Sequence, residues 1–200
     1  MEFTYETKKN LTALETFEWD NVWWEQTEKK DAKRILYIGD SISCGTRRYV
    51  TILSGDKIMC DGFGTSKGLD NPYFKPTLEL CINQQYKCDA ILFNNGLHGW
   101  HLNIEEYGEY LDEMIKFLLK FNKPLYILTS TDIVDAPEKV EVIKKRNEVV
   151  SSAAKKYNLP VIDLFEIAVS DPALHNEDKV HFTDEGYKVL AERILEKVEL

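Results

Sequence analysis

A serine near the start of the chain and an aspartate–histidine pair near its end are the residues best suited to chemistry. Ser41 follows a short apolar run at residues 34–38, and Asp178 and His181 lie three residues apart before a predicted final helix. An aspartate can hold an imidazole through one ring nitrogen while the other nitrogen accepts a proton from a serine. These three residue types therefore predict nucleophilic attack on an ester or a related acyl group.

The turn around Ser41 has an alternative explanation that involves no chemistry. Gly39-Asp40-Ser41 is also good turn and helix N-cap sequence, because short polar side chains satisfy the free N–H groups of a helix. The turn would lie at the carboxyl end of the sheet, where open α/β folds form their clefts, and near the positive end of a helix dipole. Only the presence of Asp178 and His181 later in the sequence favours a catalytic role for Ser41 over a capping role.

The segment Gly39-Asp40-Ser41-Ile42, taken with the Asp-x-x-His spacing of Asp178 and His181, resembles the SGNH or GDSL-type serine hydrolase family. The resemblance implies a flavodoxin-like SGNH hydrolase fold. It also implies that Ser41 is the nucleophile, that Asp178 and His181 complete the catalytic triad, and that the reaction proceeds through an acyl-serine. No cofactor and no metal are implied.

Two further stretches match the family in the order in which it uses them. Residues 93–98 correspond to the family's G-x-N-D block, which implies that the Asn94 side chain donates to the oxyanion, with Asn95 where the family has aspartate. The N–H of Ser41 and one glycine N–H would complete the oxyanion hole. The candidates are three glycines after the second predicted strand, Gly62, Gly64 and Gly68. Gly64 is preferred because it lies just before a plausible helix.

Apolar runs alternate with helical patterns along the chain. The strand-like runs lie at residues 34–38, 57–60, 90–93, 124–129 and 159–164, and helical patterns follow each of the first four and end the chain. This alternation predicts parallel pairing with right-handed crossovers, hence a three-layer α/β/α sandwich with a five-stranded parallel sheet. The turns that follow the strands then open at one edge of the sheet, which brings the site residues together.

Residues 1–33 precede the first predicted strand and hold Trp19, Trp23 and Trp24, three of the four tryptophans. The simpler interpretation is an N-terminal arm packed on a single hydrolase-like domain at residues 34–200. A subunit interface or a carbohydrate-stacking wall would use the same residues, and the sequence does not separate these alternatives. A homo-oligomer stays possible.

Composition narrows the range of partners and compartments. A net charge of −9 argues against nucleic acid or an anionic membrane as the main partner. No signal peptide and no membrane-length apolar run are visible, and the cysteines show no paired spacing. We therefore predict reduced thiols and a cytoplasmic location for a protein that acts on a small-molecule or carbohydrate ester. The cysteines are Cys44, Cys60, Cys81 and Cys88.

The remaining polar residues of interest have ordinary explanations. His98 and His101 have a spacing that can bind a metal on a helix, but without a nearby carboxylate or cysteine they make a poor site. A cleft-lining or loop-ordering role is predicted for His98, and packing is at least as good an explanation of Trp100 as a substrate pocket. His175 and the charged run ending at Arg146 are predicted to be solvated.

The sequence as a whole predicts a serine esterase that removes a small acyl group. Acetyl on a carbohydrate is the first hypothesis, because no long apolar lid segment separates the motifs. One alternative is a catalytically impaired binding domain of the same fold, which the altered Asn94-Asn95 block suggests. A thioesterase or lysophospholipase is the other.

Overall fold

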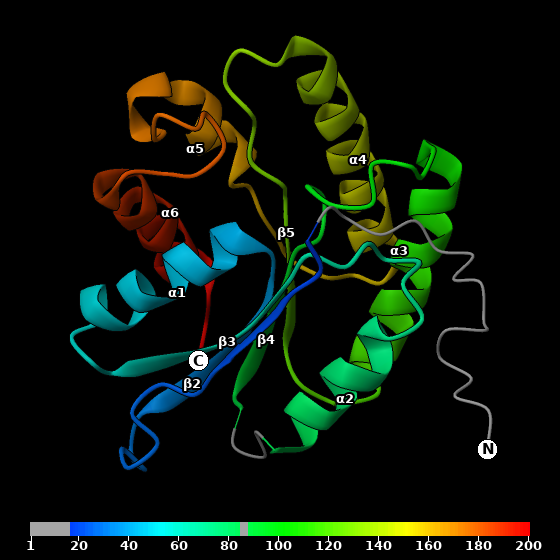
Figure 1. Cartoon of the computed structure of the whole chain (residues 1–200). Coiled ribbons are helices and arrows are strands. Elements are labelled where there is room, and N and C mark those ends of the chain that lie inside the picture. The colour runs from blue at the N-terminus through cyan, green and yellow to red at the C-terminus, as the bar shows by residue number, and fades with distance from the viewer. Residues whose placement is uncertain (1–16, 85–87) are drawn as a thin grey trace, which may run out of the picture.

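The computed structural model describes residues 17–84 and 88–200, and within them six strands form one sheet in the order β1-β3-β2-β4-β5-β6 (Figure 1). Strands β2 to β6 pair in parallel, while β1 pairs antiparallel with β3. The strands are β1 (Asp20–Trp23), β2 (Lys33–Gly39), β3 (Ile58–Thr65), β4 (Ala90–Phe93), β5 (Leu125–Leu128) and β6 (Val161–Ile162).

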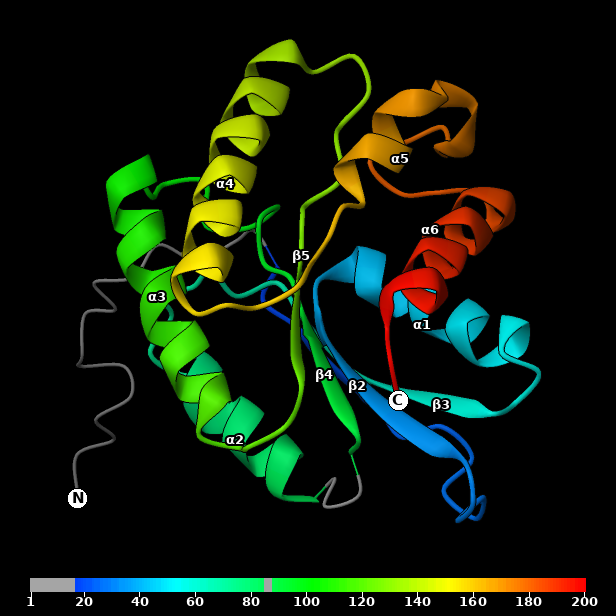
Figure 2. The same ribbon diagram turned by 180° about the vertical axis from the view of Figure 1, so that it is seen from behind.

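Helices cover both faces of this sheet, which confirms the predicted α/β/α layering (Figures 1 and 2). Helices α2, α3 and α4 lie on one face, and α1, α5 and α6 lie on the other. The helices are α1 (Ser41–Leu53), α2 (Phe74–Gln84), α3 (Ile104–Leu119), α4 (Pro137–Lys156), α5 (Phe165–Ser170) and α6 (Asp184–Lys197), with a 3-10 turn at Pro172–Leu174. No helix within the described ranges is both long enough and apolar enough to cross a bilayer.

The predicted number of strands is wrong by one. The five predicted strands correspond to β2 to β6, and the sixth, β1, comes from the N-terminal arm. All residues of β1 are exposed, so no alternation of apolar and polar residues marked it in the sequence. Backbone pairing with β3 holds it, and so does Arg47, which donates to Asn21 Oδ1 at 2.9 Å and covers the Trp23 ring at 5.5 Å.

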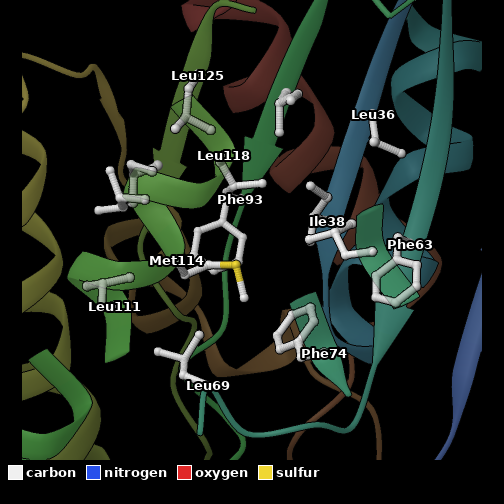
Figure 3. Packing of buried hydrophobic residues seen from close by; sticks show 14 of the residues in the cluster. Leu36, Ile38, Phe63, Leu69, Phe74, Phe93, Leu111, Met114, Leu118 and Leu125 are labelled. Atoms are coloured by element: carbon white, nitrogen blue, oxygen red, sulfur yellow. The ribbon is translucent and has the colours of Figure 1, made fainter. Parts of the chain in front are cut away.

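The central strands are buried on both faces. Leu36 and Ile38 of β2 belong to the core under α2 to α4, whereas Ile35 and Tyr37 belong to the core under α1 and α6. Strands covered on both sides have no polar face, which explains the continuous apolar runs in the sequence. Figure 3 shows the first core, where residues such as Phe93 and Met114 interdigitate between sheet and helices.

A glycine allows α6 to approach α1 closely. A Cβ atom at Gly45 of α1 would lie 2.2 Å from the Tyr187 ring of α6, so only glycine fits this helix crossing. Tyr187 in turn meets the Phe182 ring edge-on, with centroids 5.7 Å apart. This packing sets the loop that precedes α6 beside the first turn of α1, where Ser41 lies.

Candidate active site

Ser41 is the first residue of α1, and Asp40 alone separates it from the end of β2. Asp40 caps the helix, because its Oδ1 accepts the Ile42 N–H at 2.9 Å, and its carbonyl accepts the Ser43 hydroxyl at 2.7 Å. The N–H of Ser41 is among the first-turn amides for which a helix provides no acceptor. Its hydroxyl and N–H therefore lie together at the positive end of the α1 dipole.

His181 links Ser41 to Asp178. His181 Nε2 lies 2.8 Å from Ser41 Oγ, and His181 Nδ1 lies 2.6 Å from Asp178 Oδ2. The side-chain hydrogen bond with His181, aided by backbone N–H groups of His181 and Val180, lowers the pKa of Asp178 to about 2. An ionised Asp178 can only accept, so the imidazole proton belongs on Nδ1, and Nε2 is free to accept the Ser41 proton.

The loop that carries Asp178 and His181 is closed at its base by backbone bonds. Asn176 N–H donates to the His181 carbonyl at 2.7 Å, and Thr183 N–H donates to the Leu174 carbonyl at 2.8 Å. Thr183 also caps α6, because its Oγ1 accepts the Gly186 N–H at 3.1 Å. The two ends of the loop are thus bonded to each other, and the second end leads directly into α6.

Asn94 follows β4 and lines a small crevice together with Asp40. Its amide donates to the Leu128 carbonyl at 3.0 Å and to Ser130 Oγ at 3.1 Å. An oxyanion role for Asn94 therefore requires one of these two bonds to be exchanged for the substrate.

Asn95 has a different set of contacts, which joins neighbouring loops. Its side-chain amide donates to the Lys67 carbonyl at 2.9 Å, and its backbone carbonyl accepts the Tyr107 hydroxyl at 3.0 Å. These bonds tie the loop after β4 to the loop after β3 and to α3. A role in shaping the loop fits these contacts.

The preference for Gly64 as an oxyanion donor is not supported by its surroundings. Gly64 lies inside β3, opposite Asn21 of β1, and the Ser66 N–H donates to the Trp19 carbonyl at 3.2 Å. Because antiparallel pairs alternate between bonded and non-bonded residues, this register directs the Gly64 N–H to Asn21. Strand β1, which was not predicted from the sequence, occupies that edge.

The other two glycine candidates differ in the same respect. Gly62 faces Trp23 two positions along the same ladder, so its N–H also points toward β1. Gly68 lies beyond the strand, where a Cβ atom would lie 3.0 Å from the Gly99 Cα. Of the three, Gly68 is the one whose backbone is outside the ladder.

One carboxylate oxygen of Asp40 forms no hydrogen bond with any residue that the structure describes. Its Oδ2 is buried without a partner, and Thr131 Oγ1, which lines the same crevice, is in the same situation. Burial raises the pKa of the Asp40 carboxyl, while the imidazoles of His98 and His181 and the N–H groups of the α1 turn oppose that shift. A costly buried carboxylate thus lies next to the nucleophile.

Arg146 was predicted to be solvated, which is wrong: it is fully buried. Its guanidinium donates to the carbonyls of Gly96, His98 and Gly99 at 3.0, 2.7 and 2.7 Å, and it stacks on Trp100 at 5.2 Å. It therefore holds the loop after β4. Its spacing on α4 from the buried Ile143 and Val150 is a helical-face signal that could have found it.

His175 and His101 lie in different surroundings. His175 was also predicted to be solvated, and it is buried. His101 Nε2 lies 2.9 Å from Asp70 Oδ2, which links the loops after β3 and β4 at the surface. No group of three or more metal-ligating side chains occurs among residues 17–84 and 88–200.

A cavity of about 500 Å³ lies away from Ser41, at the opposite end of the sheet. It is lined by residues at or just before the starts of strands, including Lys33, Asp89 and Lys123. Lys33 lies 3.6 Å from Asp89, and Lys29 lies 2.6 Å from Asp56, so two of its cations are already paired. Size alone does not make this cavity the reaction site.

The fold is a mostly parallel sheet covered by helices on both faces, with Ser41, Asp178 and His181 together at its carboxyl end. The family model described as GDSL-like Lipase/Acylhydrolase matches residues 95–194, half of the chain. The chain therefore belongs to the GDSL-like lipase/acylhydrolase family and is a carboxylic-ester hydrolase. The matched range contains Asn95, Asp178 and His181, and begins after Ser41. None of the curated protein sequences compared with the chain matches it.

Solved structures with the same fold have low sequence identity to this chain. An acetyl xylan esterase is 19% identical, with a TM-score of 0.68, covering 83% of this chain and 100% of its own. A lipase/acylhydrolase from Enterococcus faecalis is 20% identical (TM-score 0.66; coverage 82% and 94%). A catalytic mutant of an acetylxylan esterase from Geobacillus stearothermophilus is 18% identical (TM-score 0.67; coverage 84% and 94%). At these identities the likeness shows the fold.

Proposed function

We propose that this protein is a serine esterase that hydrolyses small acyl esters, with Ser41 as nucleophile, His181 as general base and Asp178 as the residue that orients the imidazole. The observation that carries the proposal is the continuous hydrogen-bonded series from Ser41 Oγ to His181 Nε2, at 2.8 Å, and from His181 Nδ1 to Asp178 Oδ2, at 2.6 Å. A capping role for the serine needs neither contact.

In the proposed reaction, Ser41 Oγ attacks the ester carbonyl carbon while its proton moves to His181 Nε2. The carbon–oxygen bond to the alcohol then breaks, the imidazolium returns the proton to the departing alkoxide, and an acyl-serine remains. Water, deprotonated by the same imidazole, releases the carboxylic acid and regenerates the serine. Asp178 stabilises the imidazolium and stays ionised throughout.

The tetrahedral intermediate needs hydrogen-bond donors for its negative oxygen. The Ser41 N–H is suited to this role by its place in the first turn of α1, and we assign the Asn94 amide as the side-chain donor. Asn94 would give up its bond to Ser130 or Leu128 as the oxyanion forms. An oxyanion donor of this kind typically contributes about 3–4 kcal/mol to transition-state stabilisation.

The proposed substrate is an acetyl ester, with a carbohydrate as the alcohol. Support comes from the acetyl xylan and acetylxylan esterases among the solved structures of this fold, including catalytic mutants in which a serine or a histidine is replaced by alanine.

The four cysteines are free thiols, which suits the cytoplasmic location predicted from the sequence.

Hydrolysis of p-nitrophenyl acetate tests the proposal. The wild type should release p-nitrophenol, and a folded Ser41→Ala variant should be inactive because it lacks the nucleophile. Ser152→Ala is a matched control, since Ser152 is an exposed serine on α4. A Ser41→Ala protein that keeps wild-type kcat/KM would end the serine-esterase assignment, whereas an inactive wild type would favour the binding-domain alternative.

A series of p-nitrophenyl esters of increasing chain length tests the acyl group. Efficiency should fall steeply from acetyl to butyryl and be negligible at octanoyl. Equal or higher kcat/KM on the octanoyl ester would point instead to a lipid or thioester substrate. Release of acetate from an acetylated xylooligosaccharide, compared with acetylated glycerol as a control, tests the carbohydrate part.

A further inference from the structure

His175 lies directly behind the loop that carries Asp178 and His181. It stands just before Asn176, whose N–H donates to the His181 carbonyl, and it forms an antiparallel bridge with Phe182 at the base of the loop. The rings of His175 and Phe182 lie 4.3 Å apart. His175 is thus built into the support of the loop.

Asp132, in the loop after β5, meets His175 from the other side. His175 Nε2 lies 3.0 Å from Asp132 Oδ1, with side chains 1% and 12% exposed. The two atoms are at ion-pair distance, although the ring is not aligned for a hydrogen bond. Burying a carboxylate or an imidazole alone is costly, so each group is expected to be stabilised by facing the other.

A second, exposed connection joins the same two loops. Val134 N–H donates to the Lys179 carbonyl at 2.9 Å, and Lys179 Nζ lies 3.6 Å from Asp135 Oδ2. Lys179 and Asp135 are both largely exposed, so their ion pair is expected to contribute little. The loop with Asp178 and His181 is therefore attached to the loop after β5 by one buried side-chain pair, one backbone hydrogen bond and one surface ion pair.

We propose that Asp132 and His175 are positioning residues for the reaction: their buried contact fixes the base of the loop and so keeps the His181 imidazole aligned between Asp178 and Ser41. This inference rests on the proposed serine-esterase function. Neither residue touches the reacting atoms. Their effect arises because a displacement of about 1 Å between catalytic groups can reduce the rate on the order of 100-fold.

Two substitutions of His175 separate the polar contact from the packing. His175→Phe keeps a ring against Phe182 and removes the nitrogen that faces Asp132. His175→Gln removes the ring and can keep a nitrogen near the Nε2 position. We expect His175→Phe and Asp132→Ala to lower kcat about 10- to 100-fold with little change in KM, and His175→Gln to retain more activity than His175→Phe.

Asp135→Asn is the matched control, because it removes the exposed pair between the same two loops and asparagine tolerates the positive φ of 61° at this position. Its kcat should stay within about twofold of the wild type. Assays are run well below the melting temperature of each variant, so that loss of global stability does not register as loss of rate.

A measurement independent of catalysis is the ¹⁵N NMR spectrum of the imidazoles, assigned with His181→Ala. In the wild type and in Asp135→Asn, the neutral His181 ring should hold its proton on Nδ1. In His175→Phe and Asp132→Ala it should exchange between both nitrogens. His175→Phe and Asp132→Ala proteins with wild-type kcat and an unchanged His181 tautomer would overturn the proposal, as would a His175→Phe protein faster than His175→Gln. If Ser41→Ala retained hydrolysis, the proposed function would fail, and the NMR spectrum would still decide the positioning role.

Discussion

At the amino end of the sheet, Arg34 and Asp61 form a buried ion pair joined by two hydrogen bonds, whereas at the carboxyl end several buried polar atoms have no hydrogen-bond partner among the residues that the structure describes. Arg34 donates through Nε to Asp61 Oδ2 at 3.0 Å and through Nη2 to Asp61 Oδ1 at 2.6 Å. Asp61 Oδ1 also accepts the Glu25 N–H at 2.8 Å. This geometry is bidentate and uses the hydrogen-bonding capacity of both partners.

At the other end, the loops after three neighbouring strands each hold a buried atom without a hydrogen-bond partner among the described residues. These atoms are Asp40 Oδ2 after β2, Asn95 Oδ1 after β4 and Thr131 Oγ1 after β5. An unsatisfied buried polar group costs stability, typically about 1–3 kcal/mol. The comparison shows that one end of the sheet is organised for stability, and that the other, where the proposed nucleophile also lies, retains costly polar groups in its loops.

The largest expected effect on stability is at the amino end. Arg34→Ala should lower the free energy of unfolding by about 3–5 kcal/mol, because it leaves the fully buried Asp61 carboxylate without its counter-charge. Urea titration measures the loss. Lys33→Ala, which removes an exposed contact to Asp89, should change stability by less than about 1 kcal/mol. Equal effects from the two variants would contradict the comparison. The fraction of Arg34→Ala that remains folded should keep wild-type kcat.

At the carboxyl end the expected effect is on rate. Asn94→Ala should lower kcat roughly 100- to 1000-fold with little change in KM, because an oxyanion donor acts chiefly in the transition state. Asn95→Ala should cost less in kcat, and its loss should follow a lower melting temperature, since its amide joins two loops. Side-by-side kinetics and thermal melts decide this. A pure kcat loss in Asn95→Ala alone would make Asn95 the donor.

The smallest expected effect is the pH dependence of stability. Burial raises the pKa of Asp40 in the folded state, so its favourable contribution is present below the unfolded pKa of about 4 and is lost as pH rises through the folded pKa. Asp40→Asn keeps a good N-cap. It should therefore gain stability relative to the wild type between pH 4 and pH 7, measured by urea titration at each pH.

Asp178 provides the opposite sign and serves as the control for that experiment. Its pKa is lowered to about 2, so its contribution is present above pH 4 and is lost as pH falls toward 2. Asp178→Asn should thus be less stable than the wild type near pH 7, with a difference that shrinks in acid. The same sign for both variants would contradict the assigned environments.

Much of the fold could be predicted because the buried strands leave a clear pattern. Strands covered on both faces appear as apolar runs, and the run at residues 34–38 is almost entirely buried in the structure. The strand β1 left no such pattern, since its residues are exposed and backbone bonds to β3 hold it. A strand held by its backbone is invisible to hydrophobic periodicity.

The proposed site was predictable where it depends on chain position and less so where it depends on packing. Ser41, Asp178 and His181 occupy sequence positions that the topology brings to one sheet edge. The burial of His175 depends on Phe182 and on a loop more than 40 residues away, which local sequence does not report. The direction of the Gly64 N–H likewise depends on β1.

The central claim is that His181 activates Ser41. The most direct measurement is the rate at which a fluorophosphonate modifies the protein, with the modified residue located by peptide mass spectrometry. The wild type should carry the label on Ser41, and His181→Ala, with its fold intact, should react at least about 1000-fold more slowly. Labelling of a different residue, or equal rates for the wild type and His181→Ala, would contradict the account.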